Sequence, residues 1–306
     1  MSNQSSLTAI VLTYNEELHL ERCLQSLQSV CSDIVIVDSY STDKTKQIAK
    51  KYNARFFQNA WTNHATQLNW GIDNTAIKTD WVIRVDADEY LSETLQKEIQ
   101  EKLSIQKHNI TGIRVKRLMY FFDQPLKKSG MYPIWHLKIW RNGMAHCEQR
   151  WMDERMKLSS GEIASIDGDL IDHNLNNLTW WTAKHNGYAT REAIDILDKI
   201  YGFTSAEIVK GKFFGSSEER RRWLKERYLK LPLFVRPFIF FLIRYFFQLG
   251  FIEGKRGFIW NVLQCFWYRF LVDAKIYEAY YKAGKNKEKL IQFFKDEYGY
   301  DVTKVS

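Results

Sequence analysis

Apolar runs that end abruptly in polar residues mark the first third of the chain. The three clearest runs, each short enough for a buried strand, cover residues 7–12, 34–37 and 81–85. Leucines recur at helical spacing over residues 20–27, after the first run, and a short helix is predicted over residues 44–52, after the second. Strands that alternate with helices through short polar loops predict βαβ units. We therefore expect an α/β fold with a mostly parallel central sheet flanked by helices.

The polar residues that follow the three runs are expected at one edge of this sheet. Residues 13–16 follow the first run, residues 38–43 the second, and Asp86 and Asp88 the third. The carboxyl ends of parallel strands meet at this edge, where open α/β sheets bind ligands. Carboxylates there suit Mg²⁺ or Mn²⁺, which are often held by one or two acids together with substrate phosphates. The alternative is a solvated acidic turn in front of a helix that begins near Ser92.

Four motifs in this order resemble the family 2 glycosyltransferases, which have the GT-A fold. They are residues 10–17 (IVLTYNEE), 37–45 (VDSYSTDKT), 67–72 (QLNWGI) and 85–89 (VDADE). The resemblance covers about the first 190 residues, and it is specific because four motifs coincide. Within the family the chain looks most like bacterial enzymes of lipopolysaccharide core or exopolysaccharide synthesis, such as the core β-1,4-glucosyltransferases. That closer similarity continues through residues 231–237 and 266–270.

The resemblance implies a role for each residue of these motifs. The residues that it places around the nucleotide sugar are Thr13, Tyr14, Asn15, Glu16, Asp38, Asn69 and Asp86. Asp38 would accept a hydrogen bond from the base, Asn69 would lie along the nucleotide and sugar, and Asp86 would face the ribose and sugar. Asp88 would bind a metal ion, Mn²⁺ or Mg²⁺, that bridges the diphosphate. Structural alternatives are that Asn15 caps a helix, that Asp38 closes a turn and that Asn69 lies on the surface.

A late histidine, His173, is the candidate for a further metal ligand. It follows a short strand-like segment, and GT-A enzymes often present a histidine to the metal from such a position. Imidazole suits Mn²⁺ better than Mg²⁺. His173 could instead hydrogen-bond the backbone at the end of a strand, and Asp172 is a competing ligand.

The chemistry implied by the resemblance also needs a base. In an inverting sugar transfer the base removes the proton of the acceptor hydroxyl while the diphosphate leaves on the opposite face. The candidates are Asp153 and Glu154, and we favour Glu154 because family members with other residue pairs keep the second acid. The alternative is a surface turn that is salt-bridged to a neighbouring arginine.

Basic and aromatic residues are concentrated in the last third of the chain. Residues 206–306 contain 20 Lys and Arg against 11 Asp and Glu, a net charge of +9, whereas residues 1–205 contain 24 against 25. The last third also holds 25 of the 46 aromatic residues, a composition typical of membrane interfaces. Prolines and arginines interrupt the apolar stretch 231–251, so we expect helices that lie in the headgroup region. The alternatives are a subdomain that packs its aromatics internally and an oligomer interface.

The sequence therefore predicts a GT-A catalytic domain over residues 1–205 and a helical, membrane-associating region over residues 206–306. The predicted reaction is the metal-dependent, inverting transfer of a hexose, glucose or a related sugar, from a UDP-sugar to a lipid-linked saccharide. Its product would belong to lipopolysaccharide, capsule or exopolysaccharide. The expected partners are the UDP-sugar, the lipid-linked glycan acceptor and an anionic membrane surface, with no nucleic acid. The sequence does not indicate an oligomeric state.

Two other functions are consistent with parts of the sequence. A sugar-phosphate nucleotidyltransferase would hold a triphosphate in a glycine-rich loop after the first strand, but residues 13–17 contain no glycine. A non-catalytic membrane-binding protein would explain the basic third but not the acidic edge. Four scattered cysteines without a C-x-x-C pair argue against disulfides and structural zinc, and the N-terminus lacks the features of a secretory signal. We expect a cytoplasmic protein, peripheral on the inner face of the bacterial cytoplasmic membrane.

Overall fold

The computed structural model describes residues 6–149, 155–204 and 217–303, and the chain folds into two compact units. Within the described residues the first unit ends at Leu175 and the second begins at Asn176. The boundary that we drew from composition, after residue 205, lies beyond helix α5 (Leu178–Tyr201), which belongs to the second unit.

Parallel strands form the first half of the nine-stranded sheet in the first unit. The strand order is β3–β2–β1–β4–β8–β6–β11–β5, with β7 beside β6. β1 (Leu7–Thr13) pairs in parallel with β2 (Asp33–Asp38) and with β4 (Trp81–Asp86), and β2 pairs in parallel with β3 (Arg55–Gln58). The three apolar runs of the sequence are thus three adjacent parallel strands, and the predicted α/β fold is confirmed.

The second half of the sheet is mixed. β8 (Ile134–Arg141) is antiparallel to β4 and to β6 (Ile110–Phe121), while β11 (Glu162–Asp172) is parallel to β6. β5 (Glu89–Leu91) is antiparallel to β11, and β7 (Gln124–Pro125) is antiparallel to β6. Only two residues separate β4 from β5, a reach of about 10 Å, whereas four strand spacings amount to about 19 Å. The strands from β4 to β5 must therefore curl toward one another.

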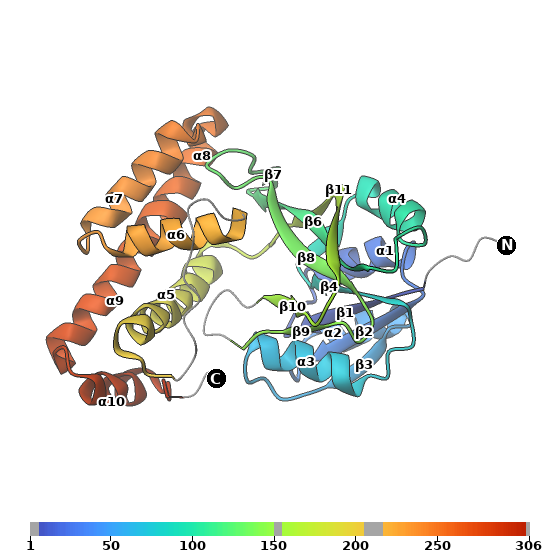
Figure 1. The fold of residues 1–306 in the computed structure, drawn as a ribbon, viewed down its shortest axis with the longest axis horizontal. Helices are drawn as coiled ribbons and strands as arrows, with labels where there is room; N and C mark the ends of the chain where they lie inside the picture. Colours follow the sequence, from blue (N-terminus) through green and yellow to red (C-terminus); the bar gives the residue numbers. More distant parts are fainter. Residues whose placement is uncertain (1–5, 150–154, 205–216, 304–306) are drawn as a thin grey trace. The chain divides into compact units, whose positions relative to one another are not determined.

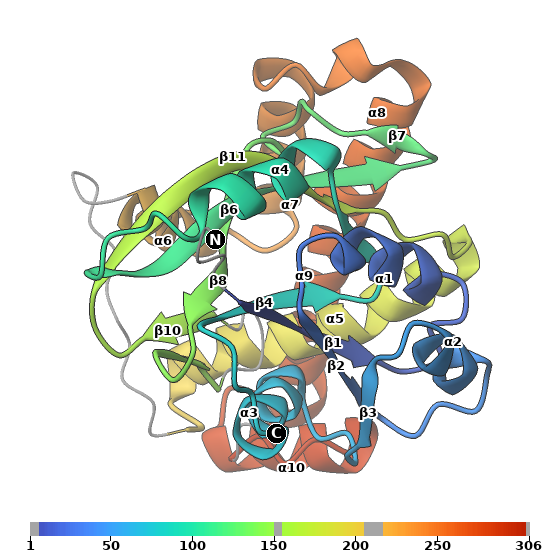
Figure 2. The same ribbon diagram turned by 90° about the vertical axis from the view of Figure 1, so that its right-hand side faces the viewer.

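Helices cover both faces of the parallel strands (Figure 1, Figure 2). Alternate residues of β1 point to opposite faces, so Ala9 and Val11 join one apolar cluster and Ile10 and Leu12 another. The helices of the first cluster are α1 (Leu20–Gln28), α2 (Thr45–Lys51) and α4 (Glu93–Lys102). The elements of the second cluster are α3 (His64–Asn74), β9 (Ala145–Cys147) and β10 (Met156–Leu158). A Cβ atom at Gly71 would lie 2.8 Å from Val37, so glycine lets α3 approach the sheet closely.

The second unit is helical, as the sequence predicted for the C-terminal region. After α5 it contains α6 (Ser217–Leu229), α7 (Val235–Leu242), α8 (Gly254–Trp260), α9 (Tyr268–Ala283) and α10 (Lys287–Tyr298). Shorter helical segments with other hydrogen-bond patterns are η1 (Ile243–Phe247), η2 (Gly250–Glu253) and η3 (Asn261–Trp267). The core of this unit is built mainly from α5, α9 and α10. No single helix of the described residues is long and apolar enough to cross a bilayer; Val235–Phe247 and Gly250–Ala283, bent by 70°, satisfy length and composition only together.

Candidate functional site

Side-chain hydrogen bonds join the loops that follow β1 and β2. Thr13 Oγ1 donates to Asp38 Oδ1 over 2.9 Å, and the N–H of Asn15 donates to Ser41 Oγ over 2.8 Å. Asn15 Oδ1 accepts from the N–H of Thr42 over 2.9 Å, so the side chain of Asn15 links the two loops. Asn15 has a φ of 55°, a conformation that asparagine tolerates better than most residues. The structure therefore brings Thr13, Asn15 and Asp38 into one wall at the carboxyl edge.

Asp38 is the buried centre of this wall. Besides the hydroxyl of Thr13, its carboxylate accepts from the N–H of Ser41 over 2.9 Å and from Gln58 Nε2 over 3.2 Å. A fully buried carboxylate needs such donors because burial without them is costly. The protein itself therefore uses much of the hydrogen-bonding capacity of Asp38, and a nucleotide base would have to share or replace one of these donors.

Two tyrosines lie exposed beside this wall. The exposed fractions are 62% for Tyr14 and 57% for Tyr40, and such rings can stack on a planar base. The sequence analysis gave Tyr40, which lies in the motif 37–45, no role of its own; the structure gives it a φ of 62°, which is unusual for a bulky residue. Glu16 is held differently, because its Oε2 lies 2.6 Å from His19 Nδ1.

The five strands from β4 to β5 each contribute charged side chains to one network. These side chains are Arg84, Asp86, Lys138, Arg117, Asp172 and Glu89. Lys138 Nζ lies 2.6 Å from Glu89 Oε2 and 3.5 Å from Asp86 Oδ2. Arg117 Nε donates to Asp172 Oδ2 over 2.7 Å. The N–H of Asp86 also donates to Glu89 Oε2 over 2.9 Å, so this network fixes the start of the turn that carries Asp88.

The network and its burial shift the pKa values of its carboxyl groups in different directions. Burial raises the pKa of Asp86, but Arg84 and Lys138 outweigh burial and hold the pKa well below its usual range. Burial raises the pKa of Glu89 to about 7, with Lys138 opposing and Asp86 adding to the increase. Burial also raises the pKa of Asp172. Asp86 consequently stays ionised at neutral pH and can attract a cation or accept hydrogen bonds from hydroxyl groups.

Asp88 and His173, the two predicted metal ligands, lie next to each other. The N–H of His173 donates to the carbonyl oxygen of Asp88 over 3.1 Å, and Asn174 Nδ2 donates to Asp88 Oδ2 over 3.0 Å. Arg22 Nη2 donates to the carbonyl oxygen of His173 over 2.6 Å, and Arg22 Nη1 lies 3.0 Å from His173 Nδ1. Arginine can only donate, so Nδ1 accepts. The neutral ring then carries its proton on Nε2, which lies 2.8 Å from Asp123 Oδ1.

The donor chemistry of this turn fits a hard divalent cation that arrives with a nucleotide diphosphate. The described part of the chain contains no group of three or more His, Cys, Asp or Glu side chains able to hold a metal alone. Mg²⁺ and Mn²⁺ often need only one or two carboxylates besides phosphate oxygens. Burial is the main cause of the raised pKa of Glu89 and of Asp172, and the charge of Asp86 adds to both increases. His173 could join through Nε2 only if its proton moved to Nδ1, which would end the hydrogen bond from Arg22 Nη1 as well as the contact with Asp123.

Asn69 joins α3 to β9. Its Nδ2 donates to the carbonyl oxygen of Cys147 over 2.9 Å, and its Oδ1 accepts from the N–H of Cys147 over 2.8 Å. Both polar groups of the amide thus bind one backbone residue. This pairing gives Asn69 a scaffold role beside the role at the nucleotide that the resemblance implies.

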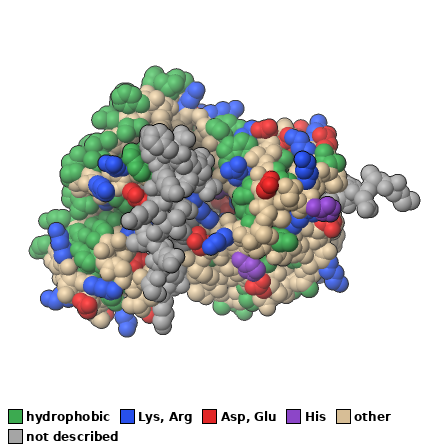
Figure 3. Space-filling view, viewed as in Figure 1, with side chains coloured by type: hydrophobic (Ala, Val, Ile, Leu, Met, Phe, Trp, Pro, Cys, Tyr) green, Lys and Arg blue, Asp and Glu red, His purple; other side chains and the backbone are tan. Residues whose placement is uncertain are grey.

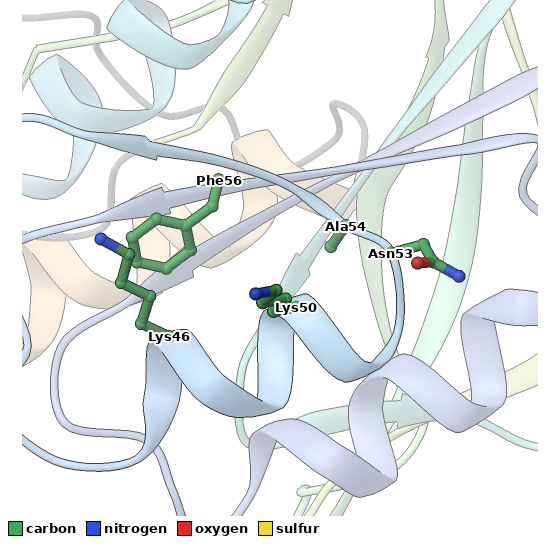
Figure 4. Close-up of a pocket in the computed structure, with 5 residues that line it drawn as sticks. All are labelled: Lys46, Lys50, Asn53, Ala54 and Phe56. Carbon is green, nitrogen blue, oxygen red and sulfur yellow. The ribbon is translucent and has the colours of Figure 1, made fainter.

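The two candidate bases lie outside the described residues, so the structure adds nothing on Asp153 and Glu154. A shallow depression of about 330 Å³ elsewhere on the unit is lined by Lys46, Lys50, Asn53, Ala54 and Phe56 (Figure 4). It contains none of the residues that the sequence analysis singled out. We therefore assign it no part in the site.

The sequence analysis missed the charged side chains that support the acidic turn. Arg84 lies inside an apolar strand, and Lys138 is 5% exposed in the middle of β8. A charged residue inside an apolar strand is a usable signal, because lysine and arginine are rarely buried unless they are paired. Arg22 gave no comparable signal, since its position in α1 is typical of a surface helix.

Sequence comparisons connect the chain with known glycosyltransferases. Residues 8–155 match the family model for glycosyl transferase family 2. The chain is 26% identical to a protein named as an uncharacterized glycosyltransferase of Rickettsia typhi, covering 90% of this chain and 88% of that protein. It is also 26% identical to the lipopolysaccharide core biosynthesis glycosyltransferase LpsC of Rhizobium meliloti, covering 90% and 93%. A crystal structure of S. aureus TarS residues 1–349 is similar with a TM-score of 0.43 and 15% identity, covering 96% and 92%.

The sheet with its acidic carboxyl edge and the matched relatives define an enzyme that transfers sugars. Residues 8–155 form a domain of glycosyl transferase family 2, and relatives matched over 90% of the chain are named glycosyltransferases; the family model ends before β10, β11 and His173. The resemblance seen in the four motifs is confirmed. Glycosyl transfer is thereby favoured over nucleotidyl transfer and over a non-catalytic role.

Proposed function

We propose that this glycosyltransferase moves a hexose, glucose or a related sugar, from a UDP-sugar to a lipid-linked saccharide, with inversion at the anomeric carbon. The product would belong to lipopolysaccharide, capsule or exopolysaccharide, made on the inner face of the bacterial cytoplasmic membrane. The observation that carries the proposal is the acidic turn Asp86–Asp88, held by buried ion pairs at the carboxyl edge of the sheet. The relative LpsC, named for lipopolysaccharide core biosynthesis, supports the class of acceptor.

The residues of the edge have separate tasks in this proposal. Tyr14 offers an exposed ring to the uracil base, and Asp38 accepts a hydrogen bond from that base in exchange for one of its present donors. Asp86, which stays ionised, accepts hydrogen bonds from hydroxyl groups of the ribose or the sugar. Asp88, with His173 as a second ligand, would hold Mg²⁺ or Mn²⁺, and such an ion neutralises charge on a departing diphosphate.

The chemical step in this proposal is a direct displacement. Glu154, or Asp153 in its place, removes the proton from the acceptor hydroxyl, and the acceptor oxygen forms a bond to the anomeric carbon. The bond from that carbon to the β-phosphate oxygen breaks on the opposite face, and UDP leaves with both electrons. The proton thus ends on the carboxylate base, and the leaving group is UDP.

Donor screening tests the proposed reaction. The full chain is incubated with Mn²⁺, a detergent-solubilised lipid-linked saccharide and a panel of UDP-, GDP- and dTDP-hexoses, and the released nucleoside diphosphate is measured. We expect release that depends on the acceptor and on a UDP-hexose. Release from a GDP- or dTDP-sugar alone would overturn the assignment of the donor.

A second experiment tests the base. Glu154→Gln should keep its affinity for UDP in calorimetry and lose about 10²- to 10⁴-fold in turnover, because the base acts only in the chemical step. Glu162→Gln, an exposed change in β11, is the matched control. Normal turnover in Glu154→Gln would move the role to Asp153 or elsewhere.

A further inference from the structure

The helices from α7 to α9 form a hairpin in the second unit. Residues 235–247 make one arm, the chain turns at Gln248 and Leu249, and the second arm continues to residue 283. Ring contacts pair the arms in antiparallel order. The rings of Phe238 and Phe266 are 4.6 Å apart, and those of Tyr245 and Phe258 are 5.8 Å apart. Residues 242–252 therefore form the closed end of the hairpin.

The exposed side chains of the closed end are almost all apolar. They are Leu242, Ile243, Phe246, Phe247, Gln248, Leu249, Phe251 and Ile252, with Gln248 the single polar one in this range. Phe247 is 82% exposed. Figure 3 shows apolar side chains gathered over the α7 and α8 end of the second unit. Contiguous apolar surface of this kind marks a site of interaction with a membrane or a protein.

The interior of the hairpin contains buried polar groups beside the aromatic rings that pair its arms. Arg236 and Asp273 are both buried near the open end, where Arg236 Nε donates to Asp273 Oδ1 over 2.8 Å. Asn261 is fully buried nearer the closed end, and its Nδ2 donates to the carbonyl oxygen of Gly257 over 2.7 Å. Polar groups paired inside and apolar side chains outside are the arrangement that a lipid environment favours.

The length of the shorter arm limits how deep the hairpin could enter a bilayer. Its 13 residues span about 20 Å, less than the hydrocarbon thickness of about 30 Å. Arg244 donates to Gln248 Oε1 over 2.9 Å, and its guanidinium lies 4.8 Å from the ring of Phe240. Arg244 and the exposed Lys255 can extend toward phosphate groups while their stems stay among apolar side chains. These dimensions suit entry into one leaflet.

We infer that the closed end of this hairpin inserts into one leaflet of a phospholipid bilayer and anchors the enzyme there. The inference rests on the proposed lipid-linked acceptor. It attributes membrane binding to insertion of the apolar closed end, residues 242–252, which we call the wedge, and not to charge attraction alone. A second copy of the chain is a poorer occupant, because residues 206–306, the region that carries the closed end, have a net charge of +9 and two copies of this region repel. Anionic headgroups attract the same charge.

Vesicle flotation of the full chain tests the wedge. The vesicles contain phosphatidylcholine with or without phosphatidylglycerol, in 0.1 and 0.5 M salt (roughly Debye lengths of 10 and 4 Å). We expect binding to anionic vesicles that persists in high salt, since apolar insertion is not screened. Phe247→Glu with Ile252→Glu should lower the partition coefficient about 100-fold, because each of the two buried apolar side chains is worth roughly tenfold.

The matched control is Tyr281→Glu, which places a charge on a 77% exposed aromatic residue of α9 away from the closed end. It should leave vesicle binding within about twofold of the parent chain. Unchanged flotation of the Phe247/Ile252 variant, with an unchanged circular dichroism spectrum, would overturn the inference. A parent dimer in light scattering that this variant splits into monomers would also overturn it, in favour of a second copy.

Failure of the wedge and failure of the proposed function give different results. With a detergent-solubilised acceptor, the Phe247/Ile252 variant should still release UDP at the parent rate, because no bilayer is present. Flotation of the parent chain without any release of nucleoside diphosphate would leave the wedge intact and remove the proposed reaction.

Discussion

The N–H of His173 donates a hydrogen bond to the carbonyl oxygen of Asp88, which joins the end of β11 to the turn after β4. Arg22 reinforces the joint from α1, because Nη2 donates to the carbonyl oxygen of His173 and lies 3.4 Å from that of Asp88. Three segments that are distant in sequence thus fix the backbone around one carboxylate. A rigid backbone of this kind lets Asp88 present its carboxylate without first losing conformational freedom.

Replacing Asp88 by Asn should remove metal-dependent nucleotide binding while preserving the fold. The amide keeps an oxygen that can accept from Asn174, but it loses the negative charge that a divalent cation needs. We expect the affinity for UDP in the presence of Mn²⁺ to fall about 10- to 100-fold in calorimetry. Asp167→Asn, which changes a 78% exposed side chain of β11, is the control. Equal affinity for the parent and Asp88→Asn would contradict the role.

His173 and Asp123 allow a second test, because we expect their replacement to change the affinity for the metal in different ways. If His173 binds the metal through Nε2, Asp123 competes for that nitrogen. His173→Ala should then lower Mn²⁺ affinity about 10- to 100-fold, whereas Asp123→Ala should leave it unchanged or raise it. Electron paramagnetic resonance of Mn²⁺ titrated in the presence of UDP measures both. A loss only in thermal stability for His173→Ala would assign the histidine to the scaffold.

Glu89 should make the stability of the first unit depend on pH. Burial raises the pKa of Glu89 from 4.5 to about 7, so between these values the folded chain binds more protons than the unfolded chain. Its contribution to stability therefore falls as pH rises from about 4.5 through 7, by on the order of 3 kcal/mol in full. Glu89→Gln removes this titration. We expect the melting temperature of the variant to decline less between pH 5 and 8 than that of the parent.

Between pH 5 and 8, the difference in stability between the parent and Glu89→Gln reports the titration of Glu89 and not that of Asp86 or Asp172. The low pKa of Asp86 gives the opposite dependence, since its stabilisation is lost as pH falls, but that loss lies below the window. The raised pKa of Asp172 acts in the same direction as that of Glu89, and it is present in both proteins. Parallel melting curves for parent and Glu89→Gln across the window would show that Glu89 does not titrate there.

Three strands of the parallel half, β1, β2 and β4, were predictable from the sequence because each is a short apolar run followed by polar residues, whereas β3, with the sequence RFFQ, was not predicted. The mixed half was not, since its connections depend on the curl that brings β5 to β11, and no local pattern encodes that pairing. The turn Asp86–Asp88 was found because two acids end a strand. Lys138 and Arg117 were not, because their partners come from other strands and become neighbours only in the folded sheet.

In the C-terminal region, too, the sequence does not show which residues become neighbours in the folded chain. Composition predicted helices and an apolar, basic surface, and the helices are confirmed. Composition could not separate the outward apolar residues of the closed end from the buried Arg236, because both occur within the same apolar stretch, and the partner of Arg236, Asp273, lies in α9. The sequence of a long apolar run with scattered arginines therefore does not show which of its residues face outward. That becomes clear only from the pairing of the two arms of the hairpin.

The pair of Arg236 and Asp273 leads to a prediction about the stability of the second unit. Asp273 also accepts from the N–H of Phe234 over 2.8 Å, so Arg236→Met would leave a buried carboxylate with one backbone donor. We expect a cost of about 3–5 kcal/mol in urea unfolding followed by circular dichroism. Adding Asp273→Asn removes the uncompensated charge and keeps an acceptor for Phe234, so the double variant should recover at least half of that loss. A double variant as unstable as Arg236→Met would attribute the loss to packing instead, and Lys230→Met, an exposed change, should cost less than about 0.5 kcal/mol.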